Sequence, residues 1–237
     1  MRIRALITLA AVLCASCSVK EVRHGCPCSL EVDYSRFAEV AGGVHLELGG
    51  LDMDRTVSDG EEMVAVLDLP RADRISVRVW SGVQSDSIFL FGASVPGMEE
   101  TVKVTAVPHK QFASVLLRIL SREDDSVSYT VKSNYSRVDL TTGRALPGDL
   151  VIPLTGIGEN HVFRLPRQSR DCMLVLETGF SNGIVQAYPL GEWIKLAGYD
   201  WEAEDLDDIM VGADFAMGHY EVKIGDWDAG ELTIPIL

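Results

Sequence analysis

Cys17 has the most specific chemical context of any residue in this sequence. The sixteen residues before it begin with Arg2 and Arg4, continue as a short apolar stretch to position 13, and end in Ala-Ser. A basic start, a short apolar segment and small residues before a cysteine are typical of a bacterial lipoprotein export signal. We therefore predict that residues 1–16 are removed and that the Cys17 thiol carries a lipid.

Two other interpretations of this segment are less favourable. The apolar stretch is far shorter than the roughly 20 residues that span a hydrocarbon core, which argues against a transmembrane helix. Cleavage before Cys14 would place Leu13 where a small residue is needed. Cys17 is therefore the preferred site of lipidation.

The remaining cysteines are Cys26, Cys28 and Cys172, an odd number for an exported chain. Cys26 and Cys28 are separated by one proline, too close for an unstrained disulfide between them, so one of the two could reach Cys172 instead. A zinc site at Cys-Pro-Cys would need two further ligands, and the sequence has no second cysteine pair and no closely spaced histidine pair. A disulfide therefore stays a possibility, and we predict no metal site.

Histidines and carboxylates could also carry chemistry, but their spacing does not indicate a catalytic centre. The five histidines are His24, His45, His109, His161 and His219, which fall on different predicted elements. No nucleophile, zinc-protease or phosphate-loop motif organises them. We predict scattered histidines, no catalytic residue and no cofactor.

Two acidic segments and four tryptophans deserve separate interpretations. The segment 52–62 alternates oxygen-bearing side chains before a glycine, but its spacing differs from that of a calcium-binding loop, so we predict a solvated loop. The segment 202–208 has five carboxylates in seven residues and is predicted to be a solvated turn.

The tryptophans could form a sugar-stacking platform, although core or interdomain packing is the simpler prediction. They are Trp80, Trp193, Trp201 and Trp227.

The charge of the chain restricts its partners. The sequence has 35 acidic and 21 basic side chains among 237 residues, a formal charge of −14, and loss of the export signal would remove two arginines and no acid. This sign disfavours nucleic acid and anionic lipid surfaces as direct partners. Membrane attachment should therefore rest on acyl chains at Cys17.

Short segments of alternating apolar and polar residues dominate the rest of the chain. They lie at residues 44–48, 75–79, 102–106, 127–131, 150–154, 173–176, 183–188, 209–215, 220–224 and 232–236. Such alternation predicts half-buried strands, and their spacing with turn residues between them is typical of antiparallel sandwiches. Residues 112–120 are apolar on both faces, which favours a central strand over a core helix. Helix is limited to a turn or two at residues 191–198 and 201–208.

The densest cluster of turn-forming residues lies at positions 141–149 and divides the strands into two similar sets. We therefore predict an all-β protein with two tandem antiparallel sandwiches. The expected division is a signal peptide at 1–16, a lipidated tether at 17–26, a first sandwich at 27–147 and a second at 148–237.

Several segments together resemble the FimB-type fimbrial anchor lipoproteins of the Bacteroidales. In chain order they are Cys-Pro-Cys at 26–28, Leu-Pro at 69–70 with Trp-Ser-Gly at 80–82, His-Lys-Gln-Phe-Ala at 109–113, Asp-Leu-Thr-Thr-Gly at 139–143, Leu-Pro-Arg-Gln at 165–168, and Asp-Leu-Asp-Asp-Ile-Met-Val at 205–211 with Gly-Asp-Trp at 225–227. The likeness extends from the export signal to the last predicted strand.

This resemblance implies transthyretin-like sandwiches and a non-catalytic role as the anchor and length limiter of a fimbrial rod at the outer membrane. It also implies that rod subunits join by donor-strand exchange, in which a strand from one chain completes a sheet of the next. Residues 18–22 lack the acidic run that often follows the lipidated cysteine in surface-exported relatives. The sequence therefore predicts lipidation more directly than surface exposure.

A second function class remains open, a surface glycan-binding lipoprotein of a nutrient-uptake system. The C-terminal residues bear on the choice because Leu232, Ile234 and Ile236 share one face of a predicted strand, and Pro235 belongs at a sheet edge. We expect this strand to close the second sandwich of its own chain. A rod subunit's strand would then enter elsewhere, in the first sandwich.

Overall fold

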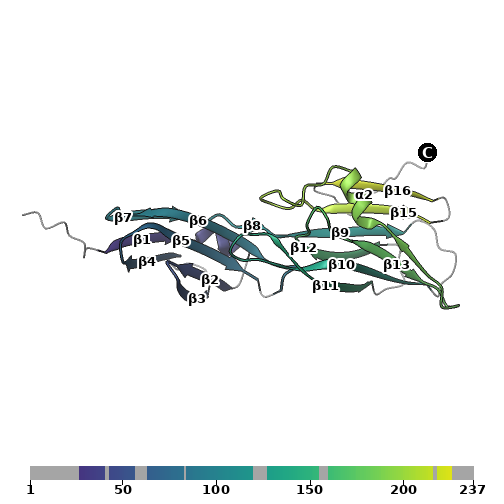
Figure 1. The fold of residues 1–237 in the computed structure, drawn as a ribbon, viewed down its shortest axis with the longest axis horizontal. Helices are drawn as coiled ribbons and strands as arrows, with labels where there is room; N and C mark the ends of the chain where they lie inside the picture. The colour runs from purple at the N-terminus through teal and green to yellow at the C-terminus, as the bar shows by residue number, and fades with distance from the viewer. Residues whose placement is uncertain are drawn as a thin grey trace, which may run out of the picture.

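The computed structural model describes residues 27–225, apart from 41–42, 57–62, 83, 120–126, 155–159 and 216–217. Within these residues the fold is almost entirely β, with sixteen strands, one α-helix and one 3-10 turn. The strands are arranged along an elongated molecule whose early and late strands occupy opposite ends (Figure 1). The all-β fold predicted from the alternating pattern is confirmed. None of the helices in this part of the chain is long and apolar enough to span a bilayer.

The N-terminal half contains two sheets. Their strands are β1 (Cys28–Asp33), β2 (Gly43–Leu48), β3 (Leu51–Thr56), β4 (Val64–Leu69), β5 (Ala72–Ser81), β6 (Phe89–Gly97), β7 (Thr101–Thr105) and β8 (His109–Lys110), with the 3-10 turn η1 (Ser35–Glu39) after β1. One sheet has the order β4-β1-β7 and the other β3-β2-β5-β6-β8. Strand β1 pairs antiparallel with β4 and parallel with β7.

Both N-terminal sheets contribute to one hydrophobic cluster. In β2 the alternation noted in the sequence places Val44, Leu46 and Leu48 inward, and β1 contributes Leu30 and Val32 from the opposite sheet. Because side chains alternate between faces along a strand, each strand can bury one row and expose the next. The two sheets therefore form a sandwich closed by aliphatic side chains.

The C-terminal half contains two further sheets and the α-helix. Its elements are β9 (Phe112–Ile119), β10 (Ser128–Val138), β11 (Ala145–Leu154), β12 (Asn160–Pro166), β13 (Val175–Gly179), β14 (Val185–Tyr188), α2 (Leu190–Leu196), β15 (Ile209–Asp214) and β16 (His219–Ile224). The sheet orders are β12-β9-β15-β16 and β11-β10-β13-β14. Strand β9 is central, as its two apolar faces predicted, and pairs with β12 and β15.

A second hydrophobic cluster joins these two sheets. It includes Val115 and Leu117 of β9, Val131 of β10, and Trp193 and Ile194 of α2. The short helix packs beside β13 and β16 (Figure 1). The helix is therefore held by packing of its apolar residues, since a segment this short is not stable alone.

The predicted strands agree with the structure in most places and miss some elements. Every described segment that alternates in sequence contains a strand, although β13 begins at Val175, after the predicted start. Strands β3, β4, β6, β8 and β12 were not predicted, and β1 also lies outside the alternating segments. Residues 201–208 form turns and no helix. The predicted strand at 232–236 lies outside the described residues, as do Cys17, Cys26 and the export signal.

The two clusters divide the chain at a different point from the turn cluster in the sequence. Members of the N-terminal cluster lie between Cys28 and Ala106, and members of the C-terminal cluster between Ala113 and Ala213. The expected boundary at residues 147/148 falls inside β11, which pairs with β10. The division of the chain into domains stays a prediction, for which these clusters favour residues 107–112.

Candidate functional site

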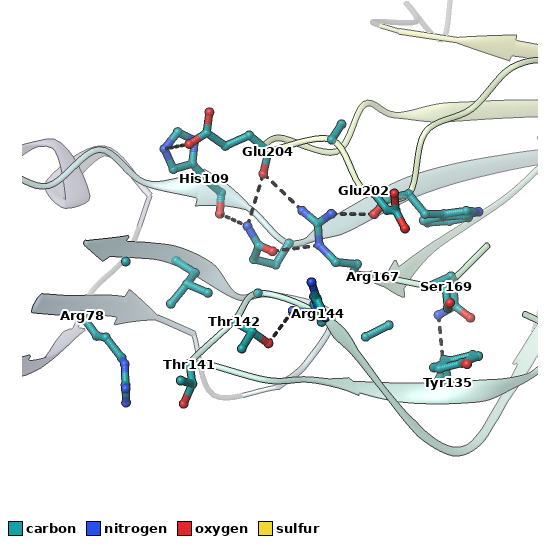
Figure 2. Close-up of a pocket in the computed structure, with 18 of the residues that line it drawn as sticks. Arg78, His109, Tyr135, Thr141, Thr142, Arg144, Arg167, Ser169, Glu202 and Glu204 are labelled. Carbon is teal, nitrogen blue, oxygen red and sulfur yellow. Dashed lines mark hydrogen bonds and ion pairs between the residues drawn. The ribbon is translucent and has the colours of Figure 1, made fainter. Parts of the chain in front are cut away.

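A cleft of about 990 Å³ lies where the two halves meet. Its lining comes from β5 and β6 of the N-terminal half and, in the C-terminal half, from the 139–145 turn, residues 167–169 and residues 201–204. Figure 2 shows Arg78 on the N-terminal side and Arg144, Arg167 and Glu202 on the C-terminal side. The cleft is at the upper end of the usual size of small-molecule sites, about 300–1,000 Å³.

The floor of the cleft is the outer face of β5 and β6. Ser76 lies opposite Ser94 and Arg78 lies opposite Gly92 in this antiparallel pair. Gly92 does not have a positive φ, and a Cβ placed on it would meet no atom within 4 Å. An interior strand glycine without a conformational need often marks a place where another molecule approaches the backbone.

A tight turn between β10 and β11 forms one wall. The Asp139 carboxylate accepts hydrogen bonds from the Thr141 backbone N–H at 2.8 Å and the Thr142 hydroxyl at 2.7 Å, and these bonds lower the pKa of Asp139. Gly143 has a φ of 68°, a left-handed conformation that suits glycine. The turn thereby holds Arg144, which follows it, at the mouth of the cleft.

Arg167 forms the buried centre of the opposite wall. It is only 6% exposed, and its guanidinium donates to Gln111 Oε1 at 2.9 Å and to the backbone carbonyls of Trp201 and Glu204. Desolvation lowers the pKa of Arg167, while neighbouring acidic groups act in the opposite direction. Gln168 next to it donates to the carbonyls of Pro166 and Tyr135. These residues have structural partners and are not free for a ligand.

The acidic segment predicted to be a solvated turn also has specific partners. His109 Nδ1 lies 3.0 Å from Asp205, and its Nε2 lies 3.0 Å from Glu204. The Lys110 backbone N–H donates to Asp205 at 2.7 Å. Asp208 accepts from the Ser114 N–H and pairs with the Lys110 ammonium. The segment is exposed turn structure, as predicted, but its carboxylates fasten it to β8 and β9.

Four of the segments that carry the family resemblance meet at this junction. Residues 109–113, 139–143, 165–168 and 205–211 each contribute one or more of the contacts described above. They are far apart in the chain, so no local spacing could have shown that they meet. Their arrangement points to a shared structural role in joining the halves.

The charged residues of the lining differ in whether they have partners. Arg78 pairs with Glu47 at 2.7 Å, Glu202 pairs with Arg170 at 2.8 Å, and Glu204 pairs with His109. Among the described residues, no side chain pairs with the Arg144 guanidinium, and Arg144 is exposed. Among the described lining residues, Arg144 is therefore an exposed cation without a side-chain partner, whereas Arg167 is buried and bonded to neutral groups.

The other histidines and the tryptophans lie apart from one another. His45 stacks on Trp80, His161 is buried beside Tyr129, and His219 is exposed on β16; His24 lies outside the described residues. Trp193 and Trp201 are buried, stacked on Tyr220 and against Tyr199 respectively, and Trp227 lies outside the described residues. The described tryptophans therefore pack and do not form one sugar-stacking surface. Within the described ranges, no three potential metal ligands come together.

The cysteines that the structure describes are both free thiols. Cys28 is buried in the N-terminal cluster, whereas Cys172 packs against the C-terminal cluster, so these two do not pair. Burial raises the pKa of the Cys172 thiol to about 11. A disulfide with Cys26 stays a prediction. Of the segment 52–62, which was predicted to be a solvated loop, residues 52–56 belong to the edge strand β3 and residues 57–62 lie outside the described part.

Comparison with known proteins gives a likeness of fold and none of sequence. No family model and no curated protein matches the chain. The fimbrial anchor protein Mfa2 from Porphyromonas gingivalis superposes with a TM-score of 0.59 at 12% identity, over 85% of this chain and 98% of that chain. A protein from Bacteroides thetaiotaomicron described as an adhesin gives 0.57 at 12% identity, over 85% of this chain and 97% of its own.

A further structure from the same Bacteroides species, described as polysaccharide-binding, superposes with a TM-score of 0.55 at 12% identity, over 81% of this chain and 93% of its own. Each of the three is covered along nearly its whole length. The chain therefore shares a complete architecture with solved proteins of this kind.

Proposed function

We propose that this protein is a non-catalytic fimbrial subunit, the lipid-attached anchor of a fimbrial rod at the bacterial outer membrane. The observation that carries the proposal is the fold shared with Mfa2 over almost the entire length of that anchor protein. The export signal ending at Cys17 supports the same function, because an anchor needs an attachment to the membrane. The segments that resemble FimB-type anchors favour that branch of fimbrial proteins.

The proposed attachment leaves the folded part away from the lipid surface. Ten residues separate Cys17 from Cys28, where β1 begins, and an extended tether of that length reaches about 33–36 Å. The excess of acidic residues repels anionic head groups, so the acyl chains alone hold the protein. Attachment to the outer face of the outer membrane, which the anchor function requires, would make the body accessible to a rod subunit.

We propose that a strand of the rod subunit adds to the edge of β4. Strand β4 ends the three-stranded sheet, and in the part of the chain that the structure describes it pairs only with β1. Val66 on this strand is 62% exposed, so an aliphatic side chain is available beside the unpaired edge. Main-chain hydrogen bonds at such an edge provide affinity, and pockets for alternate side chains provide specificity.

Filament retention tests both parts of the proposal. Cys17→Ala should release the protein from the membrane fraction and abolish lipid labelling, together with fimbriae on the cells. Val66→Lys should leave lipidation and melting temperature unchanged but reduce filament retention, since a charged residue on an edge strand opposes strand addition.

Val185→Lys is the matched control, because Val185 is 61% exposed on β14, an edge strand of the C-terminal half. Retention should be normal in this variant. An unlabelled protein that stays in the outer membrane would refute lipid attachment. Equal retention by the Val66 and Val185 variants would refute strand addition at β4 while leaving the anchor function intact.

A second candidate function is glycan binding, favoured by the cleft at the junction. The cleft offers hydroxyl, amide and charged side chains around a flat floor. A gene neighbourhood of fimbrial lipoproteins favours the anchor, whereas one with a TonB-dependent porin favours the glycan binder.

A further inference from the structure

Polar groups from both halves converge on the floor around Gly92. Ser76 and Ser94 lie beside Gly92 on β5 and β6, while Thr141 and Arg144 line the facing wall. In the view of Figure 2, Arg144 lies between Thr142 and Arg167. The site thus combines small hydroxyl side chains, open space over a glycine and one unpaired guanidinium.

The charges of the lining select an anionic ligand. Glu202 and Glu204 have cationic partners of their own, and Arg78 and Arg167 are engaged, so Arg144 alone is left to bind an added charge. A guanidinium binds a carboxylate through two parallel hydrogen bonds, which gives both strength and direction. An uncharged ligand would give the Arg144 guanidinium no anionic partner.

The floor favours a saccharide over a peptide. It is the face of β5 and β6, and the main-chain groups of β5 already pair with β2 and β6, so a peptide lying on this face finds no free main-chain partner on β5. Val77, Leu90 and Trp201 of the lining are buried, so the apolar surface left to a peptide is limited to Pro147 and the half-buried Tyr135 ring. A sugar ring can lie over Gly92 with its hydroxyls within reach of serine and threonine side chains.

We propose that the cleft binds an acidic oligosaccharide, with a uronate carboxylate on Arg144 and a sugar ring over Gly92. The inference names a ligand class for the second candidate function and does not depend on the anchor function. Filament retention tests the anchor, whereas saccharide binding tests this site, so the two can fail separately.

The test is calorimetric titration of the full chain, purified in detergent, with three probes of matched length. Trigalacturonate is the acidic saccharide, galactotriose the neutral one and triglutamate the acidic peptide. We expect trigalacturonate to bind at least tenfold more tightly than either of the others, because only it matches both the guanidinium and the hydroxyl groups. An array of acidic and neutral glycans extends the comparison beyond galacturonate.

Three variants locate the binding. Arg144→Ala should weaken trigalacturonate binding at least tenfold, and Arg144→Lys should restore part of it by returning the charge without the paired hydrogen bonds. Gly92→Phe should abolish binding by filling the floor, with an unchanged melting temperature, since that space is open. Arg36→Ala is the matched control, because Arg36 is exposed on η1, far from the lining.

Several outcomes would overturn the inference. If galactotriose bound as tightly as trigalacturonate, Arg144 would not be binding a carboxylate. If triglutamate bound most tightly, the cleft would be a peptide site. Absence of any acidic preference across the array would show that the cleft is only a structural junction. Binding that survives Gly92→Phe would place the saccharide elsewhere on the protein.

Discussion

The two halves of the molecule share a sandwich architecture but are held together differently. The N-terminal cluster is mainly aliphatic, and Ser81 is the one buried polar residue of that half within the described ranges. The C-terminal cluster contains buried aromatic residues from α2 and the turns beyond it. The other buried polar residues are all in the C-terminal half: Gln111, Ser133, His161, Arg167, Gln168 and Thr178.

This difference shows where the molecule needs a defined geometry. Aliphatic side chains stabilise a sandwich but tolerate small changes in the relative position of its sheets. Buried hydrogen bonds tolerate less, because a buried donor or acceptor without its partner destabilises the fold. The bonds of Gln111, just before β9, and Arg167, just after β12, connect these strands with the 201–204 turn at the junction. The C-terminal half therefore builds the junction, and the N-terminal half packs on it through Ile88 and Leu90, which contact Val138.

The largest expected effect concerns the division of the chain. A fragment of residues 107–237 contains β9 and β10, the central strands of both C-terminal sheets, whereas a fragment of 148–237 lacks them. We expect the first fragment to fold cooperatively and the second to stay unfolded, as measured by circular dichroism and amide proton dispersion. A folded 148–237 fragment would support the boundary expected from the turn cluster at 141–149.

Deleting residues 231–237 should have the next largest effect. Among the described residues β16 pairs only with β15. Tyr220 and Ile224 on β16 are each 37% exposed on the face that carries Val222 against the core, so an added strand could cover them. Burying Leu232, Ile234 and Ile236 there would contribute about 1.5–3 kcal/mol each, and the melting temperature should fall accordingly. A truncated protein of full thermal stability that no longer retains fimbriae would instead make the tail a donor strand.

Arg167→Met tests the polar side of the comparison. The variant keeps much of the side-chain volume but leaves Gln111 and the carbonyls of Trp201 and Glu204 without their donor, at a cost of about 1–3 kcal/mol for each buried acceptor left unpaired. Denaturant unfolding should show this loss. Arg170→Met removes an exposed ion pair with Glu202 and should cost at most about 1 kcal/mol. If both variants lost the same free energy of unfolding, the buried hydrogen bonds of Arg167 would stabilise the fold no more than the exposed ion pair of Arg170 does.

The smallest effect should come from Asp139→Asn in the turn at the cleft. Because the folded state lowers the pKa of Asp139, the carboxylate stabilises the fold above its ordinary value of 3.8 and loses this effect as the pH falls through the lowered pKa. The variant should melt below the wild type at pH 7 and together with it in strong acid. Asp149→Asn, exposed on β11, should match the wild type at both pH values. A pH-independent difference for Asp139→Asn would contradict the assignment to its charge.

Several elements could be predicted because their residues alternate without interruption. In β2 and β5 the apolar residues follow a period of two, and the faces they bury are those expected. Strand β6 was missed because Gly92 and Pro96 interrupt its pattern. Strand β3 was missed because Asp52 and its neighbours suggested an acidic loop. In both cases the hairpin pairing with the preceding strand decided the conformation.

The candidate site was out of reach of the sequence for a related reason. Arg144 lay in the turn cluster at 141–149, which indicated only a chain boundary, and Asp205 belonged to a segment expected to be solvated. Gln111 and Arg167 lay within segments that carried the family resemblance, but nothing in their spacing indicated a contact. Their roles depend on approaches between segments separated by tens of residues.

The sequence by itself determined the export signal prediction at Cys17, the strand-rich composition of the fold and the acidic character of the surface. These properties follow from the local order of residues or from the composition of the whole chain. They therefore do not depend on which distant segments come into contact. Only the tertiary structure decided that β9 and β10 belong with the C-terminal cluster, that the acidic turn binds His109 and Lys110, and that a cleft opens over Gly92. The physical reason is that alternation fixes which face of a strand is buried, whereas the choice of partner strand is made by packing across the whole sandwich.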